Sequence, residues 1–113
     1  MFRIVHNVIY HRRGDTGGLD ASSLTVDGIK LSDLTQPYTA IFSLKKSVDD
    51  AQPVLQKQMV MGQIYLLHAD TQGLSYGDYV YDVQVHIDDG TAEGRYGTIG
   101  PYAYHLLPDV TTT

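Results

Sequence analysis

The stretch from Tyr79 to Ile87 constrains the fold of this chain more than any other, because every second residue in it is aromatic or β-branched. Three of the four residues between them are polar, namely Asp82, Gln84 and His86. A repeat of two residues is typical of a strand with one buried face. Asp88-Asp89-Gly90 follows, and Asp-Gly favours a hairpin turn. The segment therefore predicts a half-buried antiparallel strand that ends in a hairpin.

Other segments share this β-rich composition. Strands are expected over residues 2–10, 24–26, 38–46, 54–60, 63–68 and 98–107. Residues 54–60 are expected to form a hairpin with 63–68. Pro101 cannot donate a hydrogen bond to a ladder, so the last strand should lie at an edge or carry a bulge there. Helical signals are limited to single turns at 47–52 and 69–73.

About seven short strands with frequent turns predict an all-β fold, an immunoglobulin-like antiparallel β-sandwich that forms one domain over residues 1–113. The chain has no cysteine, so the sandwich has no disulfide. The net charge is −5 without a basic run, and no apolar run approaches the roughly 20 residues of a membrane span. We therefore expect neither nucleic acid nor membrane as a partner. The amino-terminal residues do not resemble a signal peptide, so we expect synthesis in the cytoplasm without export.

The segment 70–83, DTQGLSYGDYVYDV, has the residue order of a tyrosine corner. In immunoglobulin-like sandwiches a tyrosine near the start of the sixth strand bonds back to the preceding corner. Leu74, Gly77 and Tyr79 fit this arrangement. We therefore expect Tyr79 to be buried, with its hydroxyl bonded to the backbone between Asp70 and Gly77. Tyr81 then stands where antibody domains have a cysteine, so aromatic packing should replace the disulfide.

Arg13-Gly14-Asp15 matches the tripeptide that integrins recognise. A turn explains it more simply, because Gly14 tolerates positive φ and the Asp15 carboxylate can accept from nearby amides. We expect these residues at a junction between a loop and a strand.

Several segments together resemble small immunoglobulin-like proteins of tailed bacteriophages and prophages, a group that includes the amino-terminal domains of baseplate upper proteins. The resemblance covers nearly the whole chain. It is carried by Arg13-Gly14-Asp15-Thr16, Asp27-Gly28 with Leu31, Phe42-Ser43-Leu44-Lys45-Lys46, Leu55-Gln56-Lys57, residues 70–83, Asp88-Asp89-Gly90 and Asp109-Val110-Thr111. The chain departs from the pattern after Thr16, where Gly17-Gly18-Leu19-Asp20 replaces an apolar strand. We expect residues 14–23 to form a mobile loop.

No motif of an enzyme is present, and no cofactor is expected. The five histidines form no His-x-His or Glu-x-x-His pair, although His68 with Asp70 and His86 with Asp88 could each share a strand face. We expect solvent-facing histidines rather than a metal site. Adjacent aspartates such as Asp88-Asp89 belong to turns, so no catalytic carboxylate pair is expected.

The nine tyrosines are the main compositional oddity. Tyr79, Tyr81, Tyr102 and Tyr104 follow strand alternation and are expected in the core. Tyr65, Tyr76 and Tyr96 are candidates for a contact surface, because tyrosine offers a large contact area at low entropic cost.

Two functions stay open at this point. The resemblance implies a non-enzymatic structural module of a virion, in the tail, baseplate, fibre or capsid, made in the bacterial cytoplasm. Its partners would be other virion proteins or further copies of the chain, and its amino-terminal segment, residues 1–10, could supply the contact. The alternative is a module that binds carbohydrate or a cell surface through exposed tyrosines.

Overall fold

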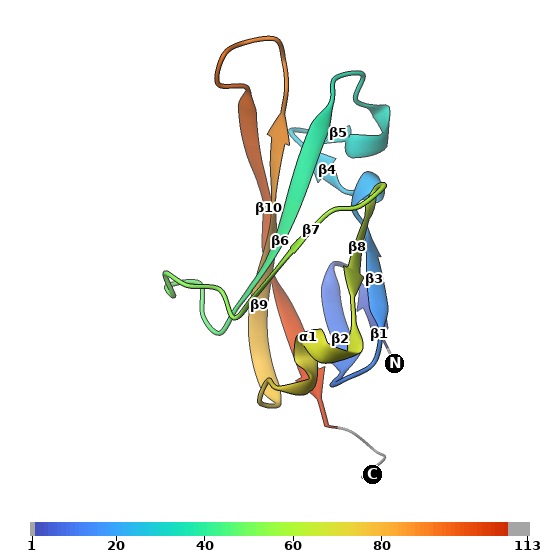
Figure 1. The fold of residues 1–113 in the computed structure, drawn as a ribbon, viewed down its shortest axis with the longest axis vertical. Coiled ribbons are helices and arrows are strands. Elements are labelled where there is room, and N and C mark those ends of the chain that lie inside the picture. The colour runs from blue at the N-terminus through green and yellow to red at the C-terminus, as the bar shows by residue number, and fades with distance from the viewer. Residues whose placement is uncertain (1, 109–113) are drawn as a thin grey trace.

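The computed structural model describes residues 2–108, which form ten strands, one α-helix and two 3-10 turns. Figure 1 shows a long sheet with shorter strands packed along one side. The strands are β1 (Phe2–Val5), β2 (Val8–Arg12), β3 (Gly17–Asp20), β4 (Thr25–Val26), β5 (Ile29–Lys30), β6 (Tyr38–Lys45), β7 (Leu55–Gln58), β8 (Gln63–Leu66), β9 (Gly77–Ile87) and β10 (Arg95–Leu107), with α1 at His68–Gln72 and 3-10 turns at Ala21–Ser23 and Leu31–Asp33. The fold is all-β, as the sequence predicts.

The main sheet has six strands in the order β1-β2-β10-β9-β6-β7. The run β10-β9-β6-β7 has the order of the G, F, C and C′ strands in an immunoglobulin variable-type sheet. Neighbouring strands are antiparallel except β2 and β10, which are parallel. The strands outnumber the expected seven because residues 2–10 form two strands, β1 and β2, and because β3 and β5 were not expected.

Strand β9 forms the centre of this sheet and confirms the predicted alternation. Its odd-numbered residues from Tyr79 to Ile87 are all buried. Strand β10 returns beside it, and their register shifts between Ile99 and Tyr102. Pro101 lies within that irregularity, where β2 no longer runs alongside. The absence of a backbone N–H at Pro101 therefore costs the sheet no hydrogen bond.

The second layer is a two-stranded sheet of β3 and β8, with the β4–β5 hairpin beside it (Figure 1). The predicted mobile loop over residues 14–23 is therefore wrong in its second half, since Gly17–Asp20 is a strand paired with β8. Gly17 is required because a Cβ there would lie 2.5 Å from the Phe2 ring. Leu19 supplies the buried apolar side chain of this short strand.

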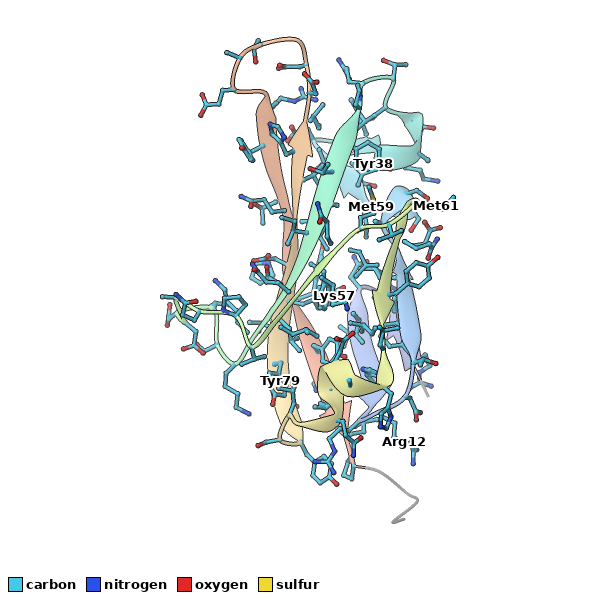
Figure 2. The ribbon with its side chains drawn as sticks, viewed as in Figure 1. Arg12, Tyr38, Lys57, Met59, Met61 and Tyr79 are labelled. Carbon is cyan, nitrogen blue, oxygen red and sulfur yellow. The ribbon has the colours of Figure 1, made fainter. Side chains whose placement is uncertain are left out.

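The predicted hairpin of residues 54–60 with 63–68 forms only at its turn. Val60 and Gln63 make one antiparallel bridge there, whereas strand β7 pairs with β6 over four residues and not with β8. Met61 and Gly62 make the tight turn between them with positive φ, and Met61 lies at its tip (Figure 2). The chain crosses from the main sheet to the second layer at this turn, because β7 forms its ladder of hydrogen bonds along the long edge of β6.

The amino-terminal segment contains two strands where one was expected. His6 and Asn7 both have positive φ and reverse the chain between β1 and β2. The Tyr81 hydroxyl donates to the Asn7 carbonyl at 2.6 Å and ties this turn to the core. The single helical turn expected at 69–73 is present as α1, whereas residues 47–52 form bends and turns without a helix.

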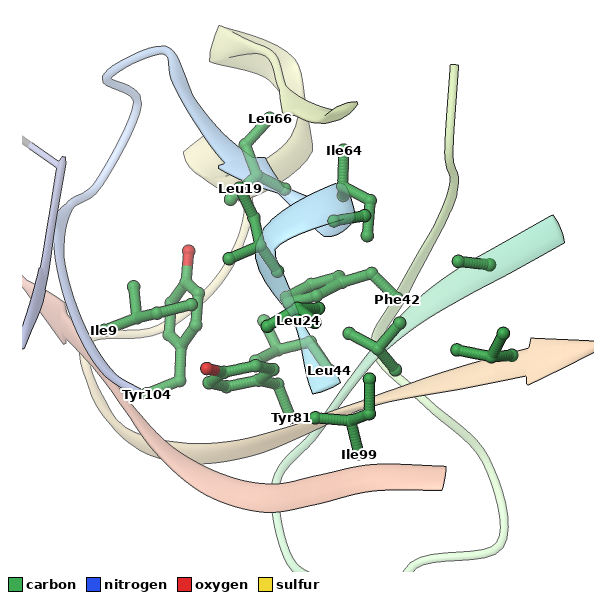
Figure 3. Packing of buried hydrophobic residues seen from close by; sticks show 14 of the residues in the cluster. Ile9, Leu19, Leu24, Phe42, Leu44, Ile64, Leu66, Tyr81, Ile99 and Tyr104 are labelled. Atoms are coloured by element: carbon green, nitrogen blue, oxygen red, sulfur yellow. The ribbon is translucent and has the colours of Figure 1, made fainter. Parts of the chain in front are cut away.

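The core lies between the two layers, where aromatic rings replace a disulfide (Figure 3). The Phe42 and Tyr81 rings stack with centroids 5.3 Å apart, and Tyr104 packs edge-on against Tyr81 at 6.4 Å. Leu19 and Ile64 face these rings from the second layer. Burial raises the pKa of Tyr81 to about 12.

Candidate functional site

The Arg-Gly-Asp segment forms a tight turn between β2 and β3. The Asp15 amide donates to the Arg12 carbonyl at 3.1 Å, and Gly14 has φ of 83°, as the third residue of a type II turn requires. The turn is docked on α1: the Gly14 amide donates to the Thr71 hydroxyl at 2.8 Å, and His68 Nδ1 donates to the Gly14 carbonyl at 2.7 Å. The expected bond from the Asp15 carboxylate to nearby amides stays a prediction.

Arg13 is held against the corner before β9. Its guanidinium donates to the Leu74 carbonyl at 3.3 Å and to the Tyr76 hydroxyl at 3.0 Å, and it lies 4.2 Å from the centre of the Tyr76 ring. These contacts direct the arginine along the protein surface. The tripeptide therefore works as a structural turn in the architecture, at the expected junction of loop and strand.

His11 connects this turn to the core. It is fully buried on β2, so the expectation of solvent-facing histidines is wrong for this residue, and its Nε2 donates to the Asp15 carbonyl at 2.7 Å. Since a carbonyl only accepts, the neutral ring carries its proton on Nε2, and Nδ1 accepts from the Tyr104 hydroxyl. Burial lowers the pKa of His11 to about 4 and raises the pKa of Tyr104. The histidine is thus a neutral structural group at neutral pH.

The tyrosine corner has the expected geometry. Tyr79 is 4% exposed, and its hydroxyl donates to the Ser75 carbonyl at 2.7 Å. Leu74 packs against the core, and Gly77 begins β9 with φ of 140°. The Lys46 ammonium lies 4.5 Å from the centre of the Tyr79 ring and covers the part of the ring nearest the surface.

The three tyrosines proposed for contact are exposed but do not share a surface. Tyr65 lies on β8, Tyr76 in the loop after α1, and Tyr96 on β10 beside the far end of β9. Tyr76 and Tyr96 are separated by the length of β9, roughly 30 Å at the rise of a strand. Arg13 covers one face of Tyr76, and the His86 ring lies 4.5 Å from the Tyr96 ring.

The histidine and carboxylate pairs considered for metal binding have separate partners. His68 and His86 each donate to a backbone carbonyl, whereas Asp70 forms an ion pair with Lys57 at 3.1 Å. Within residues 2–108, no three or more His, Cys, Asp or Glu side chains gather as a metal site would need.

A groove of about 510 Å³ lies between the start of β6 and the loop that joins β9 to β10. Asp88 and Asp89 lie in this loop and accept bonds from residues two positions on. The Thr91 hydroxyl bond to Asp89 holds the pKa of that carboxyl below its usual range. An acid of lowered pKa stays ionised at neutral pH, so Asp89 is unsuited to serve as a proton donor.

A row of four linked side chains crosses the outer face of the main sheet, away from the core. Arg3 lies 5.1 Å from the Tyr10 ring, Tyr10 stacks on the His105 ring at 5.1 Å, and His105 Nδ1 lies 2.7 Å from an Asp78 carboxylate oxygen. The four residues belong to β1, β2, β10 and β9 in turn and are neighbours in register. One end of the row is therefore cationic and the other anionic.

An apolar row lies beside this polar one. Moving two residues along each strand keeps the same face, which places Val5, Val8, Ala103 and Val80 next to the four linked side chains. We call these eight residues the outer patch: Arg3, Val5, Val8, Tyr10, Asp78, Val80, Ala103 and His105. All are exposed or half-buried, and Val5 is 42% exposed.

A groove of about 460 Å³ continues the outer patch toward Pro108. Tyr10, Tyr76, His105 and Leu107 are among the residues that line it. Gly77 borders the groove and brings no side chain to fill it. The farther half of the same sheet face is more polar, with Thr39, Gln84 and Thr98 exposed, although Ile41 is also 37% exposed there.

Sequence reasoning did not find the outer patch, although a signal was present. Residues 2–10 carry Val5, Val8 and Ile9, more apolar side chains than one buried face requires. The hairpin explains this excess, since Ile9 enters the core and the two valines lie outside. The full row becomes visible only when β10 is known to pair with β2.

Within residues 2–108, no helix combines the length and the apolar character needed to cross a membrane. Searches with the sequence against protein-family models and curated proteins, and with the fold against solved structures, find no significant match.

Proposed function

We propose that this protein is a non-enzymatic structural module of a tailed-bacteriophage particle, in its tail, baseplate, fibre or capsid. It is made in the cytoplasm of the bacterial host and acts by packing against other virion proteins or further copies of itself. The proposal joins the resemblance of the sequence to phage immunoglobulin-like proteins with the architecture of the domain.

The outer patch is the observation that carries the proposal. Four strands present an apolar row at the surface, beside a polar row that has Arg3 at one end and Asp78 at the other, while the opposite face of the same sheet is covered by the second layer. Apolar surface bordered by charge is typical of a site of protein contact.

The edge of the main sheet supports the same function. Among the described residues, β1 has a strand partner on one side only, so its other side offers backbone groups to a neighbour. A strand of a second protein can extend such an edge by main-chain hydrogen bonds. Strand addition through the amino-terminal segment would therefore use β1, because β2 already has a strand partner on both sides.

The carbohydrate-binding alternative has weaker support. A sugar platform needs a free aromatic face, yet Arg3 and His105 occupy the two sides of Tyr10. Tyr65, Tyr76 and Tyr96 lie on separate elements and do not build one concave surface.

The test is to raise antibodies against the purified chain and to probe phage particles produced by a bacterium that carries the gene. Particles are banded on a density gradient and washed in high salt, and the chain should remain with them at a fixed number of copies per particle. Disrupted particles should yield complexes that contain the chain and a tail, baseplate or capsid protein. A chain that stays entirely in the soluble fraction would refute the virion proposal.

A glycan array tests the carbohydrate-binding alternative. The labelled chain should give no signal above that of a matched unrelated sandwich protein. Binding to a defined saccharide that is abolished by Tyr65→Ala, Tyr76→Ala or Tyr96→Ala would support the carbohydrate reading against ours.

A further inference from the structure

We infer that the outer patch binds the outer patch of a second copy, face to face about a two-fold axis. The inference rests on the proposed assembly function, for which it names one partner and the surface that meets it. The evidence is the order of charge in the row that crosses the four strands, together with the apolar row beside it.

The charge order of the row makes it self-complementary. Arg3 stands at one end on β1 and Asp78 at the other end on β9, with Tyr10 and His105 between them. A two-fold axis that lies parallel to the strands and passes between Tyr10 and His105 exchanges the two ends. Each Arg3 then faces the Asp78 of the other copy, and the arrangement forms two opposite-charge pairs.

Both charged side chains are placed to reach across such an interface. Asp78 has 85% of its side chain exposed, although one of its oxygens contacts His105. Arg3 is exposed beyond the Tyr10 ring on which it rests. A carboxylate accepts through two oxygens, so Asp78 can bond His105 and the Arg3 of the second copy together.

The apolar row supplies the contact area between the charges. Val5, Val8, Ala103 and Val80 carry no long side chain, so two such faces can approach to the roughly 10 Å that separates packed sheets. With one further row along the adjoining groove, the patch spans four strands and about three rows of side chains, roughly 400 Å² on each copy. Two copies therefore bury roughly 800 Å², which is the size of a weak, transient interface.

An interface of this size predicts a weak dimer in isolation, with a dissociation constant on the order of 100 μM. In a particle, neighbouring copies would be held together by further contacts, and the weak pairing would act at a high effective concentration. Association should also weaken with salt, because the two charged pairs lie at the rim.

Charge exchange tests the inference directly. Sedimentation equilibrium at low salt, from about 10 to about 500 μM (one decade below to fivefold above the expected constant), should show a monomer–dimer equilibrium for the full chain. Arg3→Glu and Asp78→Lys should each weaken dimerisation by about tenfold, because each places two like-charge pairs in the interface. The double variant, and an equimolar mixture of the two single variants, should both restore it.

Two further variants control for folding and for the location of the surface. Lys30→Glu and Asp33→Lys make the same charge changes at exposed positions on β5 and the following 3-10 turn, and should dimerise like the parent chain. Ala103→Arg adds a long charged side chain within the patch and should abolish the dimer. Thermal unfolding of every variant checks that each is folded.

A chain that stays monomeric at 500 μM, the highest concentration of the series set around the estimated constant, overturns the inference, as does a dimer that the two charge exchanges leave unchanged or that their mixture does not restore. The virion proposal fails on different evidence, since a monomeric chain that remains with washed particles would leave that proposal standing. A charge-dependent dimer that is absent from particles would instead support the inference and refute the virion proposal.

Discussion

Protonation of His11 should account for part of the stability that the protein loses in acid. Replacing His11 with glutamine should remove most of that part. The His11 ring is fully buried between the Tyr104 hydroxyl and the Asp15 carbonyl. Burial lowers its pKa to about 4, against about 6.5 in an unfolded chain. The unfolded state therefore binds a proton first as the pH falls, and protonation favours unfolding.

The size of the effect follows from this difference in pKa. A shift of one pKa unit corresponds to 1.36 kcal/mol, so His11 contributes about 3 kcal/mol of stability that is present above pH 6.5. This contribution is lost progressively between about pH 6.5 and pH 4, and it is absent below that range. For a domain of ordinary stability this is a substantial fraction of the free energy of unfolding.

Urea unfolding followed by circular dichroism at several pH values from 7.5 to 4 measures this contribution. At pH 7.5, His11→Gln should be less stable by about 1 to 3 kcal/mol, since the Tyr104 hydroxyl loses its acceptor. Toward pH 4 the parent chain should lose about 3 kcal/mol that the variant keeps, so His11→Gln should become as stable as the parent chain or more stable. Carboxylates titrate alike in both proteins, so the difference isolates the histidine.

Tyr104→Phe is the matched control, because it breaks the same hydrogen bond but keeps the buried histidine. Its stability should run parallel to that of the parent chain as the pH falls, since burial is the main cause of the lowered pKa. Parallel curves for the parent chain and His11→Gln would refute the reasoning and show that His11 is not protonated on unfolding in this range.

Three further changes test the local architecture. Tyr79→Phe should lower the free energy of unfolding by about 1 to 3 kcal/mol in chemical denaturation, because it strands the carbonyl at the corner before β9; an unchanged midpoint would contradict the importance of that bond. Gly17→Ala should cost about 1 to 3 kcal/mol through overlap with the Phe2 ring, and Phe2→Leu in the same chain should recover part of it in thermal melts. Arg13→Lys should lower the melting temperature modestly through loss of stacking on Tyr76, while the parent chain shows no binding to immobilised integrin; capture by integrin would reverse our interpretation of the tripeptide.

Local signals in the sequence were enough to predict several elements. The alternation from Tyr79 to Ile87 reflects which side of a strand is buried, and that periodicity is a property of the strand itself. Asp27-Gly28 turns between β4 and β5 with positive φ at both residues, as its composition predicts. The Tyr79 corner was predictable because its donor and acceptor lie only four residues apart.

Pairing between distant segments was decided by the tertiary structure. Residues 55–58 carry no local signal that distinguishes β6 from β8 as their partner, and the longer open edge of β6 determines the outcome. Gly17–Asp20 has a composition that is poor for a strand, yet it is a strand because it pairs with β8. Gly17 also leaves the space that the Phe2 ring occupies.

The outer patch shows this division most clearly. Alternation alone places Tyr10 opposite Ile9 and His105 opposite Leu106, so the sequence determines which side chains share a face within each strand. It does not determine that β2 lies parallel to β10, which brings Tyr10 against His105 across 95 positions of the chain. The charged row and its apolar neighbour therefore arise from long-range pairing, because register between strands depends on contacts that no local pattern encodes.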